Sequence, residues 1–374
     1  MPKSFQEFLD EANSGRSFAM LQVGTAYDNG DGVTENKEKA FEWYLKSAEH
    51  GEPLGMYYVG LAYEQGKGIN QDIHQAFEWY KKSAENGYER AMYLVGYAYM
   101  EGKGVSRDRI TAYKWFIEAA ENDSYEACLF AGLAYKDGIG VTPNATKALY
   151  FLEKSAKVFN SDALYFLGIE YLNGGIVERN IEKGFQYMKE ACFRGNDAAM
   201  YMMGAFYEKG IIVNEDPVQA LEWYKKSAEK GYPEAYFNVG LAYMVGNGVA
   251  SNHIEALKWF TKAVECNDNK AFFCMGYLYG QGEGIDKDPQ KSFYYFSKAA
   301  EIGDVNGMIC LAECYSDGTG CEKDLNKALY YYKLAQQNGN NDDIVKRRIK
   351  AIESEMVSLR KNGKKGFFGL FKRK

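Results

Sequence analysis

Residues 55–87 read GMYYVGLAYEQGKGINQDIHQAFEWYKKSAENG, in which two helical patterns flank a glycine-rich turn. The same pattern recurs nine times in the 374-residue chain. With Gly60 as the marker of one repeat, the equivalent position recurs every 36 residues, at Gly24, Gly96, Gly132, Gly168, Gly204, Gly240, Gly276 and Ala312. A fixed period of this length predicts an array of stacked structural repeats. Repetition also favours binding over catalysis as the function of the chain.

The first helix of each repeat contains the marker, from which positions are counted below. Position −5 is always small (Gly55), position −1 is apolar (Val59) and position +3 is always tyrosine (Tyr63). Positions −5, −4 and −1 fall on one helical face, so we expect this face to be buried. The small residues would allow two helix backbones to approach each other closely.

The second helix follows a glycine turn, with Gly66 and Gly68 supplying the positive φ angles that a tight turn needs. Asn or Asp stands at position +12 in every repeat and predicts the N-cap of this helix. These residues are Asn36, Asp72, Asp108, Asn144, Asn180, Asp216, Asn252, Asp288 and Asp324. The inner face carries Ala40 and Tyr44 and their equivalents, and its aromatic rings are predicted to wedge between repeats.

This pattern resembles the Sel-one-like repeat family, A-x-x-x-L-G-x-x-Y-x-x-G-x-G-V-x-x-D-x-x-K-A-x-x-W-Y-x-K-A-A-x-x-G, a relative of the tetratricopeptide repeats. All nine units are recognisable from about residue 17 to 340. The resemblance implies an all-α fold, a right-handed superhelical solenoid of nine 36-residue helix-turn-helix repeats with terminal capping helices. Ile176 and Ile212 replace the second loop glycine, so we expect the fifth and sixth loops to depart from the family geometry.

We predict four segments. Residues 1–16 form an N-terminal capping helix equivalent to half a repeat, and residues 17–340 form the nine repeats. Residues 341–361 form a C-terminal capping helix, and residues 362–374 form a basic, aromatic tail. No apolar run is long enough to span a bilayer and no hydrophobic signal segment opens the chain, so we expect a cytoplasmic location.

Seven cysteines raise the question of disulfides. Cysteine-rich members of the family have a disulfide between two cysteines in each repeat. Here the positions expected to hold the partners of Cys128 and Cys192 are occupied by Ala120 and Met200. We therefore expect reduced, mostly buried thiols. Cys310, Cys314 and Cys321 lack metal-ligand spacing and a nearby histidine, so we expect no metal and no cofactor.

An enzymatic function is an alternative, because some cysteine-rich relatives have been associated with β-lactam binding or hydrolysis. No S-x-x-K constellation with its companion motifs is visible. The three histidines, His50, His74 and His253, occupy unrelated positions. We therefore disfavour a β-lactamase-like hydrolase and predict no catalytic residues.

A row of apolar and aromatic residues occupies positions −3 and +1 of the first helices. We call it the first-helix ribbon: Tyr57, Leu61, Tyr93, Tyr97, Leu129, Leu133, Tyr165, Ile169, Tyr201, Phe237, Phe273 and Tyr277. By resemblance to the family, first helices line the concave surface, so the ribbon would form a groove for a peptide or helix. The alternative is that a tightly wound superhelix buries these residues against neighbouring repeats.

The C-terminal region reverses the charge of the chain. Residues 344–374 carry 11 Lys or Arg against 2 acidic residues, a net charge of +9, whereas residues 1–343 carry 34 against 49, a net charge of −15. In the predicted capping helix, Ile344, Ile352, Met356 and Leu359 share one face toward the last repeat. The tail itself combines basic and apolar residues: Lys364, Lys365, Phe367, Phe368, Leu370, Phe371, Lys372, Arg373 and Lys374. Three interpretations of the tail remain: an anchor to an anionic membrane surface, a docking peptide for a protein partner, and a solubilising tail.

These observations predict a noncatalytic scaffold or adaptor that binds a protein or peptide on the concave face. A peripheral membrane adaptor, held at the inner face of a membrane by the tail, is the alternative. The acidic body would repel nucleic acid, and no site for a small-molecule substrate is evident.

Overall fold

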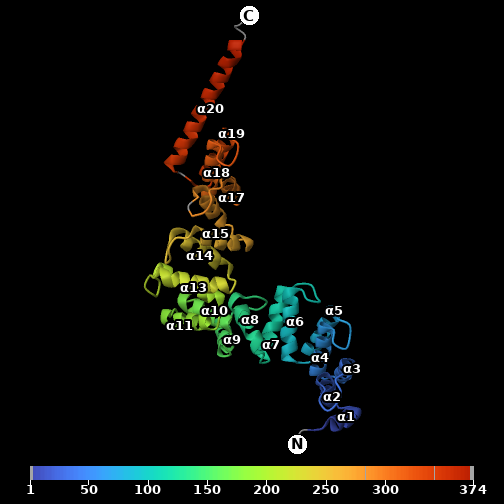
Figure 1. The fold of residues 1–374 in the computed structure, drawn as a ribbon. Helices are drawn as coiled ribbons and strands as arrows, with labels where there is room; N and C mark the ends of the chain where they lie inside the picture. Colours follow the sequence, from blue (N-terminus) through green and yellow to red (C-terminus); the bar gives the residue numbers. More distant parts are fainter. Residues whose placement is uncertain (1–2, 283, 341, 371–374) are drawn as a thin grey trace. The chain divides into compact units, whose positions relative to one another are not determined.

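The computed structural model describes residues 3–282, 284–340 and 342–370, with side chains described as far as residue 359. Within these ranges the chain forms helices joined by turns, and no strand (Figure 1). The helices are α1 (Phe5–Asn13), α2 (Ser17–Asn29), α3 (Lys37–Glu49), α4 (Pro53–Gln65), α5 (Ile73–Glu85), α6 (Glu89–Glu101), α7 (Arg109–Glu121), α8 (Tyr125–Asp137), α9 (Ala145–Lys157), α10 (Ser161–Asn173), α11 (Ile181–Phe193), α12 (Asp197–Lys209), α13 (Pro217–Glu229), α14 (Pro233–Val245), α15 (His253–Glu265), α16 (Ala271–Gln281), α17 (Pro289–Glu301), α18 (Val305–Asp317), α19 (Leu325–Gln337) and α20 (Asp343–Leu370).

The chain divides into two compact units, one ending at Arg194 and the other beginning at Gly195. Helices α1 to α11 belong to the first unit and α12 to α20 to the second. Within each unit, every helix packs mainly on the helix before it and the helix after it. This local pattern of contacts is typical of repeat proteins. The predicted all-α solenoid of nine two-helix repeats is therefore confirmed.

The predicted N-caps of the second helices are confirmed. Asn36 accepts a 2.8 Å hydrogen bond from the backbone N–H of Lys39, and Asp72 accepts bonds from His74 and Gln75 at the start of α5. The same side-chain cap begins α7, α9, α11, α13, α15, α17 and α19. Because a cap satisfies N–H groups that a helix start leaves unpaired, each Asn or Asp fixes where its helix begins.

The marker glycine allows the two helices of a repeat to pack closely. A Cβ atom on Gly60 would lie 2.7 Å from Cδ1 of Tyr80, the residue at position +20. The small residue at −5 serves the contact with the preceding repeat, since a Cβ atom on Gly55 would lie 2.6 Å from Oγ of Ser47. Tyr44 also stacks on Tyr58 of the next repeat, with ring centroids 4.8 Å apart. The predicted close approach and the aromatic wedge are both present.

The fifth and sixth loops respond differently to their missing glycine. Ile212 keeps the left-handed conformation, with φ at 72°, close to the 70° of Gly68. A β-branched residue is strained there because its Cβ crowds the backbone. In the fifth loop, Ile176 instead donates a 2.9 Å hydrogen bond from its N–H to the buried carboxylate of Glu170. Lys136 of the preceding repeat pairs with the same carboxylate at 3.5 Å. Ile176 is not among the residues with positive φ, so the fifth loop departs from the glycine geometry.

Each terminal helix packs against the neighbouring repeat of its own unit. Helix α1 places Ala12 in a cluster with Ala19 and Met20 of α2. Helix α20 buries Val345, Ile349 and Ile352 against α19.

The predicted inner face of the C-terminal capping helix needs a correction. Ile352 and Met356 do pack inward, but Ile344 and Leu359 are 56% and 58% exposed. Positions 345, 349 and 352 follow the helical period, and Ile344 lies about 100° around the helix from Val345. The helix also continues to Leu370, past the predicted end at residue 361.

Candidate functional site: notches between successive repeats

Five position −3 members of the first-helix ribbon pack on the aromatic ring at position +20 of the same repeat. Ring centroids are 5.7 Å apart for Tyr57 and Tyr80 and 5.8 Å apart for Phe237 and Phe260. Tyr93, Tyr201 and Phe273 make the same contact with Phe116, Tyr224 and Phe296. Tyr57 and Leu129 are buried, so they cannot contribute to a binding surface without rearrangement.

The position +1 members of the ribbon reach the surface. Tyr97 and Tyr277 are 42% and 44% exposed, and Leu61, Leu133 and Ile169 are half-buried. Tyr93, Tyr165, Tyr201, Phe237 and Phe273 at position −3 are also half-buried. The ribbon is therefore neither wholly buried nor one continuous exposed strip. Its inner row stabilises each repeat, and its outer row, at position +1, is available for contact.

Small cavities lie beside the outer row, between one repeat and the next. Each is lined by position +20 of one repeat and by position +1 of the following one, together with position +4 of the first. We name these cavities by their two repeats: notch 1–2 (Asp28, Tyr44, Leu61), notch 2–3 (Glu64, Tyr80, Tyr97), notch 6–7 (Glu208, Tyr224, Leu241) and notch 8–9 (Gly280, Phe296, Glu313). Notches 1–2 and 2–3 lie in the first unit, and notches 6–7 and 8–9 lie in the second. The repeat architecture thus produces recurrent, shaped openings on the first-helix side.

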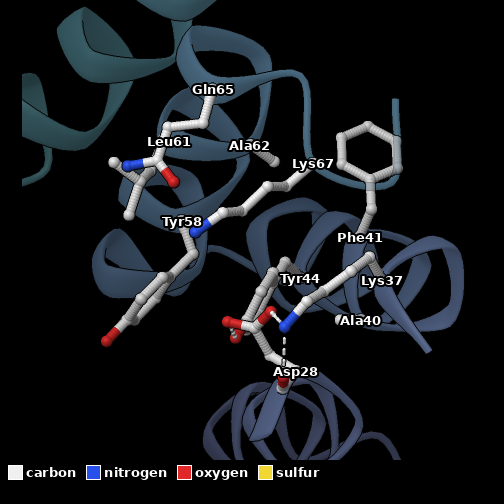
Figure 2. Close-up of a pocket in the computed structure, with 10 residues that line it drawn as sticks. All are labelled: Asp28, Lys37, Ala40, Phe41, Tyr44, Tyr58, Leu61, Ala62, Gln65 and Lys67. Atoms are coloured by element: carbon white, nitrogen blue, oxygen red, sulfur yellow. Dashed lines mark hydrogen bonds and ion pairs between the residues drawn. The ribbon is translucent and has the colours of Figure 1, made fainter. Parts of the chain in front are cut away.

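A tyrosine and a carboxylate meet at the floor of three notches. The Tyr80 hydroxyl donates to Glu64 Oε2 at 2.7 Å, and the Tyr224 hydroxyl donates to Glu208 Oε2 at 2.9 Å. The equivalent distance in notch 1–2, from Tyr44 to Asp28, is 3.5 Å. Figure 2 shows this third pair, with Lys37 reaching Asp28 beside the Tyr44 ring.

The charges in notch 2–3 hold the carboxylate ionised. Burial raises the pKa of Glu64, but hydrogen bonds from Tyr80 and Lys103 outweigh burial and leave the pKa below its ordinary value. Lys103 comes from the next repeat and lies 2.9 Å from Glu64 Oε1. Burial raises the pKa of the Tyr80 phenol, and its bond to Glu64 raises it further. These side chains therefore bind two repeats together as well as lining the notch.

Sequence reasoning missed this pair, although the chain carries a signal for it. Repeats with an acidic residue at position +4 have Tyr at position +20, as in Asp28 with Tyr44, Glu64 with Tyr80 and Glu208 with Tyr224. Repeats with Phe, Leu or Met at position +20 have no acid at +4. Comparing these two positions across repeats would have predicted the contact. The ninth repeat is the exception, because it has Tyr332 at position +20 and Ser316 at position +4.

None of the seven cysteines, all of which are described, forms a disulfide, and Cys128, Cys192, Cys274 and Cys314 are buried. Burial raises the pKa of the Cys128 thiol to about 11.

Among the described residues, no group of three or more His, Cys, Asp or Glu side chains could hold a metal ion. No helix in the described ranges is long and apolar enough to cross a bilayer.

The tail lies largely outside what the structure describes. The backbone of Lys364, Lys365, Phe367, Phe368 and Leu370 belongs to α20, but their side chains are not described. Phe371, Lys372, Arg373 and Lys374 lie beyond the described residues. The predicted role of the tail therefore stays a prediction.

Comparison with known proteins identifies the repeat. The model of the Sel1 repeat family matches residues 17–52, 53–88, 89–124, 126–157, 161–196, 197–232, 233–268, 275–304 and 307–340, well over half of the chain. A search among curated proteins gives no match.

Solved structures show the same fold. A protective antigen of uropathogenic Escherichia coli, c5321, described as displaying an SLR fold, is 25% identical. Its match covers 95% of this chain and 91% of the antigen, with a TM-score of 0.53. A Sel1 repeat protein from Oxalobacter formigenes is 26% identical over 90% of this chain and 93% of its own, with a TM-score of 0.57.

Proposed function

The chain belongs to the Sel1 repeat family, whose members generally act as protein-interaction scaffolds, and on that premise we propose that it binds a protein partner through its first-helix side. The partner segment would lie across successive repeats, in contact with the outer row at position +1 and with the notches beside it. The exposure of Tyr97 and Tyr277, at equivalent positions in different repeats, carries this proposal.

The chemistry of the outer row suits protein recognition. Tyrosine offers a large, rigid apolar surface with a hydroxyl at its tip, and it is enriched at the energetic centres of interfaces. Covering one such side chain completely contributes about 1.5–3 kcal/mol before ordering costs. The outer row also varies from Leu61 to Tyr97 to Ala205, whereas the markers hardly change. Variation where packing does not dictate the residue is what partner specificity needs.

The proposed chemistry is binding without catalysis. The tyrosine–carboxylate pairs of notches 2–3 and 6–7 are hydrogen-bonded to each other, which favours a structural role for them. We therefore do not propose the hydrolase alternative, and the cytoplasm remains the proposed location.

A matched pair of variants tests the proposed surface. Tyr97→Ser combined with Tyr277→Ser should abolish co-purification of the partner while leaving the melting temperature unchanged, because both rings are exposed. Tyr150→Ser is the control, since Tyr150 is 57% exposed but lies on the second helix α9. Equal loss of partner in the control variant, or full retention in the Tyr97 and Tyr277 variant, would contradict the proposal.

A second candidate is peripheral membrane attachment through α20. In its described part, Lys346, Arg347, Arg348 and Lys350 are exposed, as are Val357 and Leu359. Basic residues near anionic lipid contribute about 1 kcal/mol each, and apolar residues add insertion. Sedimentation with vesicles containing phosphatidylserine tests this candidate. Removal of residues 363–374 should weaken binding, and equal binding by both forms would reject the tail as an anchor.

A further inference from the structure

Notch 8–9 differs from the equivalent notches in size. Its cavity measures about 290 Å³, whereas notches 1–2, 2–3 and 6–7 measure about 40, 40 and 50 Å³. The other three place an acidic side chain at position +4, but repeat eight has Gly280 there. The loss of that side chain opens the floor of the notch.

A second substitution, at position 292, leaves little room for a side chain at position 280. Ser292 replaces the usual alanine at position +16 and donates a 2.8 Å hydrogen bond to the backbone carbonyl of Gly276. A Cβ atom on residue 280 would lie 2.9 Å from Oγ of Ser292. Ser292 therefore favours glycine at position 280, and glycine leaves the cavity unfilled at that position. Aromatic rings line it, from Tyr277 and Phe296.

The charge of this cavity is also unlike that of the others. Glu313 replaces the apolar residue at position +1, and Asp317 joins it one helical turn later. Lys67 and Lys103, which line notches 1–2 and 2–3, are replaced here by Thr319. No basic residue is among those that line notch 8–9.

Glu313 is the acidic group that lines this cavity at position +1. It is half-buried, and the described residues offer it neither a hydrogen bond nor an ion pair within 4 Å. Burial raises its pKa, the charge of Arg348 on α20 opposes that shift, and Asp317 adds to it. A half-buried carboxylate with no ion pair within 4 Å is a favourable place for a cation from outside.

We propose that notch 8–9 binds one arginine side chain presented by an extended segment of the partner protein. The inference rests on the proposed scaffold function and names the chemistry of its ligand. The guanidinium plane would stack on the Tyr277 ring, which is 44% exposed, while its N–H groups pair with the Glu313 and Asp317 carboxylates. Arginine suits this site better than lysine because its planar fork can stack and form two parallel hydrogen bonds at once.

The chain itself supplies the design of the closing experiment. The double variant Gly280→Met with Ser292→Ala restores residues found at the equivalent positions, Met100 and Met244 at +4 and alanine at +16. It should fill the cavity while keeping the fold. Glu313→Gln removes the charge at nearly constant shape. Melting temperatures of both variants show that they are folded.

The probe is a randomised dodecapeptide library displayed on phage and selected on the full-length protein. Wild type should enrich peptides with arginine at one fixed position, and Glu313→Gln should weaken a selected peptide by about tenfold. The cavity-filled variant should lose its binding, and replacing the arginine of the peptide with lysine should weaken it less than replacement with glutamate does.

The outcomes separate this inference from the scaffold function. Selected peptides that bind the cavity-filled variant as tightly as wild type, or a selection without arginine enrichment, would overturn the arginine site. If such peptides still lose binding with the Tyr97 and Tyr277 variant, the scaffold function stands without it. A synthetic peptide of residues 362–374 tests the source of the arginine. Its binding, if dependent on Glu313, would support the site and show that the tail of this chain can supply the arginine.

Discussion

Tyr80 donates a 2.7 Å hydrogen bond to Glu64 across the two helices of one repeat, and Lys103 of the next repeat pairs with the same carboxylate. This contact links the internal packing of a repeat to its stacking on the following repeat. Tyr80→Phe should lower the free energy of unfolding by about 1–2 kcal/mol, because a hydrogen bond to a charged group is lost. Urea unfolding measures the change. The chain tolerates phenylalanine at the equivalent position, as Phe116, so an effect below about 0.3 kcal/mol would contradict this account of the pair.

Stability should depend on the ionisation of Glu64. The folded protein holds the pKa of Glu64 below its ordinary value of 4.5, so this group stabilises the fold above that value. The contribution is lost as the pH falls through the lowered pKa. Glu64→Gln should therefore be less stable than wild type at pH 7, and the difference should shrink on acidification below pH 4. A difference that grows on acidification would show that the pKa is raised instead.

The strained sixth loop offers a stabilising substitution. Ile212 has φ at 72° and is 39% exposed, so Ile212→Gly should remove strain at little cost in packing. The gain should be about 0.5–1 kcal/mol after the extra flexibility of glycine in the unfolded chain is counted. Thermal unfolding should show a higher melting temperature. The matched reverse change, Gly68→Ala, should be destabilising, because its Cβ would lie 2.1 Å from the carbonyl oxygen of Lys37.

Replacing Ser155 should cost no stability, whereas replacing Ser83, the equivalent residue of another repeat, should destabilise the fold. The Ser83 hydroxyl donates a 2.7 Å hydrogen bond to the carbonyl of Pro53, but the buried Ser155 hydroxyl has no hydrogen-bond partner in the structure. Ser155→Ala should therefore leave stability unchanged or raise it by up to about 1 kcal/mol, whereas Ser83→Ala should cost about 0.5–1.5 kcal/mol. Chemical denaturation of both variants checks the contrast. Equal losses would mean that Ser155 does have a partner.

The fold could be predicted from the sequence because every repeat restates the same local rules. Asn36 and Asp72 sit at the same position in their repeats and cap the same helix, and Gly68 occupies the turn that needs positive φ. Helix caps and tight turns depend on residues close together in the chain. Because the same residues recur in nine repeats, the sequence specifies each of these local structures nine times.

The candidate site was only partly predictable. Tyr93 and Tyr97 look alike in sequence, yet Tyr93 packs on Phe116 while Tyr97 is exposed, because the ring at position +20 covers only one of the two rows. The size of notch 8–9 depends on Gly280 and Ser292, which lie on different helices. Distances between helices set these features, and the periodic pattern of apolar residues does not encode them.

Photo-cross-linking tests the central claim most directly, that the first-helix side carries the binding surface. A photoreactive phenylalanine replaces Tyr97, Tyr277 or the control Tyr150 in the full chain, and the protein is irradiated with its partner present. We expect covalent adducts to the partner from position 97 or position 277 and none from position 150. Adducts from position 150 alone would place the binding surface on the second helices and contradict this claim.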